Sequence, residues 1–109
     1  MKFNKQMLQF DELFFNEFNG YTIYFIIDKE NAPIWLKEMF HPQKDTEQYY
    51  ELSIELISGD ERPFVQVSPV SIINNVHTNY DWKDIYVTDE ELLFLLDQAQ
   101  EQINNKKTF

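Results

Sequence analysis

The sequence predicts an α+β fold, in which an antiparallel sheet of three to five strands carries an N-terminal and a C-terminal helix on one face. Three observations predict this fold: apolar residues recur at helical spacing near both ends of the chain, alternate at strand spacing in its middle, and are separated by turn-forming residues. The length of 109 residues fits a single domain, 1–109. These patterns do not define the order of the strands.

The N-terminal segment, 3–18, has an apolar residue at every third or fourth position. On a helix these side chains form one stripe, and Gly20 then suits the left-handed position that follows a helix end. The alternative is a hairpin, with Asn19 and Gly20 as a type I′ turn. The apolar residues before this turn do not alternate cleanly, so we expect the helix. Its stripe consists of Phe3, Met7, Phe10, Phe14 and Phe18.

The next two segments predict a strand and a short helix. Residues 21–28 are rich in β-branched and aromatic side chains, which is typical of a mostly buried strand. A helix over 32–40 fits the flanking signals: Asn31 as N-cap, Pro33 in the first turn and Pro42 just past the end.

The middle of the chain gives the clearest strand signal. Apolar side chains at Tyr50, Leu52, Ile54 and Leu56 point one way, and Tyr49, Glu51, Ser53 and Glu55 point the other. The letters "SGDERP" form a turn, and "FVQVSPVSII" returns as the antiparallel partner. Pro69 cannot donate to a ladder, which predicts an edge or a bulge there. We expect a loop over 74–81 and a short final strand over 83–87.

The closing helix begins at Thr88, which is an N-cap with Glu91 at N3, as in a capping box. The acids of its first turn complement the helix dipole and need no functional explanation. Its apolar face is expected to contain Leu92, Leu95, Leu96, Ala99 and Ile103.

Phe94 does not fit this face, because it falls among Glu90, Asp97 and Glu101 on the opposite side. An aromatic side chain within a charged rim is typical of a protein-binding surface. Two alternatives stay open: burial of Phe94 against another element of the same chain, and a homodimer contact.

Charge restricts the partners. Nineteen acidic residues oppose nine basic ones, for a net charge of −10. Such a surface repels nucleic acid and anionic membranes and attracts basic proteins, although it can also serve solubility alone. The chain lacks cysteine, a signal-peptide core and an apolar run long enough for a membrane span, so we expect a cytoplasmic protein.

Enzymatic motifs are not found in the sequence, so we expect no catalytic residues, no cofactor and no metal. Two glycines cannot form a glycine-rich phosphate loop, and with Arg62 as the one arginine, bidentate clamping of phosphate is poorly supplied. His77, Asp81 and Asp84 match no metal-ligand spacing and are interpreted as surface residues.

The sequence therefore favours an acidic interaction module that binds and inhibits a basic partner. In its sharpest form the carboxylates replace DNA phosphates on a nucleic-acid-processing enzyme, by analogy of size and charge with anti-restriction, anti-CRISPR and immunity proteins, some of them from phages or mobile elements. The alternative is an assembly subunit that self-associates through exposed aromatic and hairpin surfaces, with no inhibitory role. The predicted partner-binding residues are Phe94, Glu90, Asp97, Glu101, Tyr49, Glu51, Glu55, Asp60 and Glu61.

Overall fold

The computed structural model describes residues 2–17, 20–56 and 64–107, and it confirms an α+β fold built on an antiparallel sheet. The described residues form six strands, one more than the sequence predicted, and two helices. The elements are β1 (Gln9–Asn16), β2 (Gly20–Asp28), α1 (Ile34–Met39), β3 (Glu47–Leu56), β4 (Phe64–Ile73), β5 (Val76–Asn79), β6 (Lys83–Asp84) and α2 (Asp89–Lys107).

The sheet is a meander in which each strand pairs with the next, in the order β1-β2-β3-β4-β5. The short β6 also pairs with β4, at 66–67, while β5 pairs with 70–73. Pro69 lies between these two pairings, so its missing N–H breaks neither ladder. The sequence predicted an edge or a bulge at Pro69; instead, Pro69 faces the gap between β5 and β6, which pair with β4 on either side of it.

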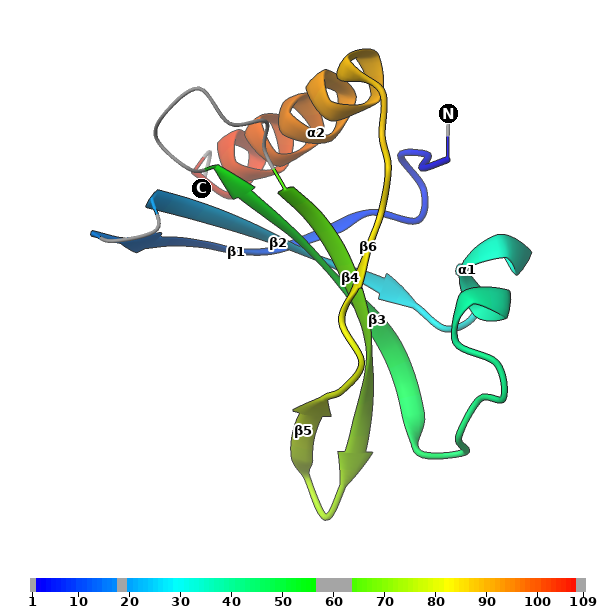
Figure 1. Ribbon diagram of the computed structural model, residues 1–109. Helices are drawn as coiled ribbons and strands as arrows, with labels where there is room; N and C mark the ends of the chain where they lie inside the picture. Colours follow the sequence, from blue (N-terminus) through cyan, green and yellow to red (C-terminus); the bar gives the residue numbers. More distant parts are fainter. Residues whose placement is uncertain (1, 18–19, 57–63, 108–109) are drawn as a thin grey trace.

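The sheet curls into a half-barrel, with α2 near the end of β3 and α1 directly after β2 (Figure 1). Its inner face carries the alternating apolar residues of β2, β3 and β4, of which Phe25, Leu52 and Val67 are fully buried. Leu36 of α1 and Leu95 of α2 join the same core. Both helices therefore cover the inner face, and each such buried side chain stabilises the fold by about 1.5–3 kcal/mol.

The helix predicted over 3–18 is wrong. Residues 2–8 form an irregular segment with a turn, and the strand β1 follows, paired with β2 up to Asn16 opposite Gly20. Phe3, Met7 and Phe10 of the expected stripe are buried all the same, whereas Phe14 is exposed on the strand and Phe18 lies outside the described residues. The apolar side chains of this segment can be buried from a strand as well as from a helix. Pairing with β2 therefore decides its structure, and the helical spacing of its apolar residues does not.

Three smaller predictions also need correction. The N-cap of α1 is Pro33 rather than Asn31. The expected loop over 74–81 contains β5, joined to β4 by Asn74 and Asn75, whose φ angles of 52° and 65° suit a type I′ hairpin turn. The predicted final strand is shortened to β6.

The helix α2 begins as predicted, since the Glu91 N–H donates to Thr88 Oγ1 at 3.1 Å. The Glu91 carboxylate does not complete a capping box; it accepts the Phe3 N–H at 3.0 Å. Farther along, the Gln102 side chain accepts the Phe10 N–H at 2.6 Å and donates to the Leu8 carbonyl at 3.0 Å. These bonds fasten α2 to the N-terminal segment and to the start of β1.

The buried face of α2 is rotated by roughly 60° from the predicted one, toward Glu91 and Gln98. Both polar side chains are buried, at 3% and 7% exposed. The rotation brings Phe94 to the margin of the buried face, where it is partly buried and packs against the core. Packing within the chain, the alternative left open above, therefore accounts for part of the Phe94 ring, and its role in partner binding stays a prediction.

Candidate functional site

The outer face of the sheet, opposite the two helices, collects the polar side chains that alternate with the core residues. One row runs straight across the strands: Glu12 lies opposite Tyr24, Tyr24 opposite Ser53, Ser53 opposite Gln66 and Gln66 opposite Asp84. Side chains in such a row stand on one face about 5 Å apart. The row therefore joins five segments that are distant in the sequence.

Further carboxylates flank this row. Glu51 and Glu55 stand two residues before and two residues after Ser53 on β3, so they lie on the same face about 13 Å apart. Asp11 lies at the point where the register between β1 and β2 shifts, next to Glu12. The predicted outward direction of Glu51 and Glu55 is confirmed, and β1 brings two acids beside them that the sequence did not suggest.

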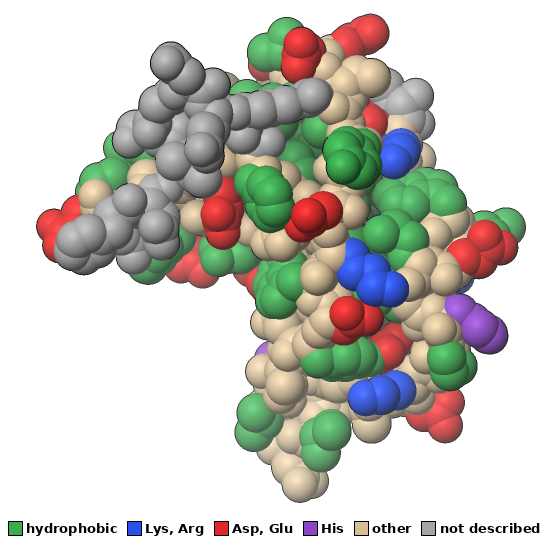
Figure 2. All heavy atoms as spheres, in the orientation of Figure 1, with side chains coloured by type: hydrophobic (Ala, Val, Ile, Leu, Met, Phe, Trp, Pro, Cys, Tyr) green, Lys and Arg blue, Asp and Glu red, His purple; other side chains and the backbone are tan. Residues whose placement is uncertain are grey.

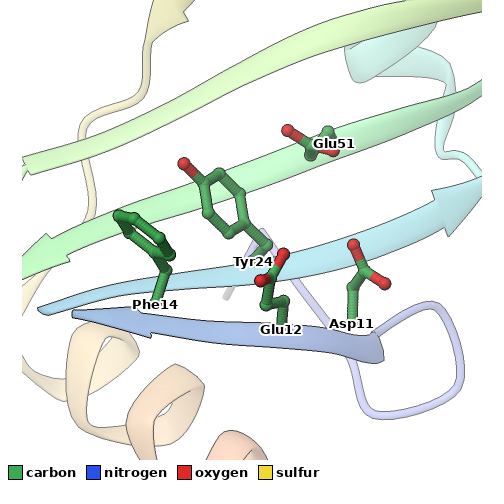
Figure 3. Close-up of a pocket in the computed structure, with 5 residues that line it drawn as sticks. All are labelled: Asp11, Glu12, Phe14, Tyr24 and Glu51. Carbon is green, nitrogen blue, oxygen red and sulfur yellow. The ribbon is translucent and has the colours of Figure 1, made fainter. Parts of the chain in front are cut away.

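Two open hollows adjoin on this face and share Tyr24. The first, of about 300 Å³, is lined by Asp11, Glu12, Phe14, Tyr24 and Glu51. Figure 3 shows these side chains standing on the same side of β1, β2 and β3. The second, of about 290 Å³, is lined by Tyr24, Ser53, Glu55, Gln66 and Trp82. We name the nine residues of both hollows the Tyr24 trough.

The carboxylates of the trough influence one another across the strands. Partial burial raises the pKa of Glu51, and the nearby charges of Asp11 and Glu12 raise it further. The pKa of Tyr24 is raised by burial and then by Glu51, Glu55 and Glu12. The trough is therefore a region of concentrated negative potential, and this potential is felt at Glu51 and Tyr24.

Basic side chains do not neutralise this potential within the described part of the chain. There the ion pairs join Lys5 to Glu101 at 2.9 Å and Lys83 to Asp81 at 3.7 Å, both outside the trough. Figure 2 shows the same imbalance on another view, where acidic side chains spread over several elements and outnumber the basic ones. The trough carboxylates are thus available to an external cation.

Ser53 lines the second hollow between the carboxylates of β3, and 5% of the residue is exposed. The neighbouring Gln66 amide donates to Asp84 at 3.0 Å. Among the described residues, the buried side-chain atoms without a hydrogen-bond partner are Glu47 Oε2 and Gln98 Oε1, and both lie outside the trough. The polar groups of the trough are therefore open to water, and its carboxylates and aromatic rings are what it offers a ligand.

The other predicted partner-binding residues lie elsewhere. Glu90, Asp97 and Glu101 are exposed on α2, which is on the inner side of the sheet, and Glu101 is engaged by Lys5. Tyr49 lies on the outer face beside Glu51, where its hydroxyl contacts His77 Nδ1 at 3.0 Å. Asp60 and Glu61 lie outside the described residues. The predicted set therefore divides between two surfaces, and Glu51 and Glu55 belong to the trough.

Seven trough residues were not among the predicted partner-binding residues: Asp11, Glu12, Phe14, Tyr24, Ser53, Gln66 and Trp82. The first three were assigned to a helix, and Tyr24 to a mostly buried strand. The alternative reading of Asn19 and Gly20 as a hairpin turn would have placed Asp11, Glu12 and Phe14 on a strand beside Tyr24, because the segment before such a turn pairs antiparallel with the segment after it.

The remaining site types find little support in the described residues. In the described ranges, no group of three His, Asp or Glu side chains is arranged to hold a metal ion. Of the two helices described, neither is long and apolar enough to cross a membrane. In comparisons with protein-family models, curated proteins and solved structures, nothing matches the chain.

Proposed function

We propose that this chain is an acidic protein-interaction module of the cytoplasm, which binds a basic surface of a partner through the Tyr24 trough. By occupying that surface it would inhibit the partner's binding to a polyanion, and a nucleic-acid-processing enzyme is the partner type that fits best. The proposal includes no catalytic role. The observation that carries it is the gathering of Asp11, Glu12, Glu51 and Glu55 on one sheet face, without a basic counterpart among the described residues.

A sheet is a suitable support for such a surface. Hydrogen-bonded strands hold the backbone of the acidic residues at regular spacings, so little backbone freedom is lost on binding. A fixed cluster of one sign also steers an oppositely charged partner and raises its association rate.

Solubility alone explains the trough less well. Charge that serves solubility can be placed anywhere, and isolated surface positions avoid mutual repulsion. Here burial and the neighbouring acids raise the pKa of Glu51, so the charged form of Glu51 is less stable at this position than it would be in water. A basic partner would remove that repulsion, which favours a binding role.

Affinity capture with two matched variants tests the proposal. The trough variant combines Glu12→Gln, Glu51→Gln and Glu55→Gln, and the control variant combines Glu90→Gln, Asp97→Asn and Glu101→Gln on α2. Each removes three negative charges, so only their place differs. Immobilised wild-type and control proteins should retain the same basic proteins from a lysate, and these should elute as salt rises. Equal retention by the trough variant would refute the proposal.

A second candidate function is self-association without inhibition. It is favoured by β1, the terminal strand of the sheet, where Leu13 and Phe15 are 46% and 59% exposed. A free strand with apolar side chains can add to another sheet edge. Light scattering across a concentration series decides this point: a dimer that persists in high salt supports self-association, and a monomer at all concentrations excludes it.

A further inference from the structure

We infer that the Tyr24 trough selects arginine over lysine in its partner. This inference rests on the proposed function and specifies the side chain that the trough recognises. It is carried by an arrangement that occurs in both hollows, where aromatic rings stand beside carboxylates.

Each hollow combines a negative group with an aromatic ring. Phe14 and Tyr24 line the first together with Glu12 and Glu51, as Figure 3 shows. Trp82 and Tyr24 line the second together with Glu55. A cation that enters either hollow can therefore meet a carboxylate and an aromatic ring at once.

The two natural cationic side chains differ in how well they use such a site. A guanidinium is planar, stacks on aromatic rings, and offers five N–H donors in a fixed fork that can pair with a carboxylate through two hydrogen bonds. An ammonium is compact and strongly hydrated, so it loses more solvation when it enters a partly buried site. The rings and the half-buried Glu51 therefore favour arginine.

Two synthetic probes test the inference: an oligo-arginine and an oligo-lysine peptide of the same length, titrated into the protein by calorimetry. We expect the wild-type protein to bind the arginine peptide about five- to tenfold more tightly, in line with cation–π and stacking contributions. Tyr24→Leu should reduce binding of the arginine peptide by a similar factor and change the lysine peptide by less than about twofold. Tyr24→Phe keeps the ring and should keep the selectivity.

Trp82→Leu provides a second test that does not depend on the sheet interior, because Trp82 is 38% exposed. It should lower the arginine preference without loss of fold, which circular dichroism checks. Equal affinities for the two peptides in the wild-type protein would overturn the inference. In that case the two charge variants decide about the proposed function. It survives if both peptides bind more weakly to the trough variant than to the α2 control, and it fails if both peptides bind the trough variant as tightly as the wild-type protein.

Discussion

Glu51→Gln should stabilise the protein at neutral pH, although it removes a charge from the surface. The carboxylate is half-buried, and its pKa is raised first by burial and then by Asp11 and Glu12. Its charged form is therefore less favourable in the folded state than in the unfolded chain. Glutamine has nearly the same shape and no charge, so it keeps the packing and removes the repulsion.

The magnitude follows from the spacing of the strands. Glu51 on β3 and Glu12 on β1 lie two strand spacings apart across the sheet and two residues apart along it, so roughly 12 Å. At that distance two unit charges repel by about 0.3 kcal/mol in water and by about 1.4 kcal/mol at an effective dielectric constant of about 20. Physiological salt, with a Debye length of about 8 Å, reduces these values to roughly a quarter. With two such neighbours we expect a gain of ~0.5 kcal/mol, within the range measured for charge pairs across strands.

Thermal and urea unfolding at several pH values measure this gain. At pH 7 the melting temperature of Glu51→Gln should rise by about 2–4 °C. Because the folded pKa is raised, the stability that Glu51 contributes is fully present below its unfolded pKa and is lost as the pH rises through its folded pKa. The difference between the two proteins should therefore disappear in acid, below the unfolded pKa of Glu51.

Glu90→Gln is the matched control, since Glu90 is exposed in the first turn of α2, where negative charge is favourable. It should leave the free energy of unfolding unchanged or lower it slightly. A destabilised Glu51→Gln at pH 7, or a gain of equal size in Glu90→Gln, would refute the reasoning that places mutual repulsion in the trough.

Three further predictions concern the core and α2. Gln102→Ala removes both hydrogen bonds between α2 and the start of β1, so urea unfolding should show a loss of about 1–3 kcal/mol. Leu95→Ala should cost about 2–5 kcal/mol because the side chain is fully buried, whereas Leu93→Ala, at a position 61% exposed, should change stability by less than about 0.5 kcal/mol; equal effects would contradict the orientation of α2. Phe94→Ala should lower the melting temperature yet leave peptide binding unchanged, because Phe94 packs against the core; lost binding with unchanged stability would support its predicted role as an anchor.

Regular local patterns made part of the fold predictable. The period-two alternation of β3 and its return strand identified the central hairpin, since alternate side chains point to opposite faces. The cap at Thr88 located the start of α2. Both signals are contained within a few consecutive residues, so they can be read without knowledge of the rest of the chain.

The N-terminal strand could not be identified in the same way. Its register shifts beside Asp11, which breaks the alternation that a regular strand would show. Its place in the sheet depends on pairing with β2, and the buried residues before it fit helical spacing by coincidence. Because this strand was not predicted, Asp11 and Glu12, half of the trough carboxylates, were not recognised as part of the site.

The orientation of α2 escaped prediction for a related reason. Apolar residues alone place the buried face around Leu92 and Ala99, but Glu91 and Gln102 turn inward because they bond main-chain groups of the N-terminal segment. Polar side chains are buried where hydrogen-bond partners are available to them. Here the partners are main-chain groups of Phe3, Leu8 and Phe10, about 90 residues away in the sequence. Phe94 was judged exposed because of this rotation.

We expect binding to a basic partner to depend on where charge lies in the Tyr24 trough and not on its total amount. This dependence is tested most directly by the affinity of the trough variant and of the α2 control for the same oligo-arginine peptide, measured over a range of salt concentrations. We expect the α2 control to bind within about twofold of the wild-type protein, and the trough variant to bind at least tenfold more weakly with a shallower dependence on salt. Equal weakening in the two variants, which lose the same number of charges, would contradict this expectation.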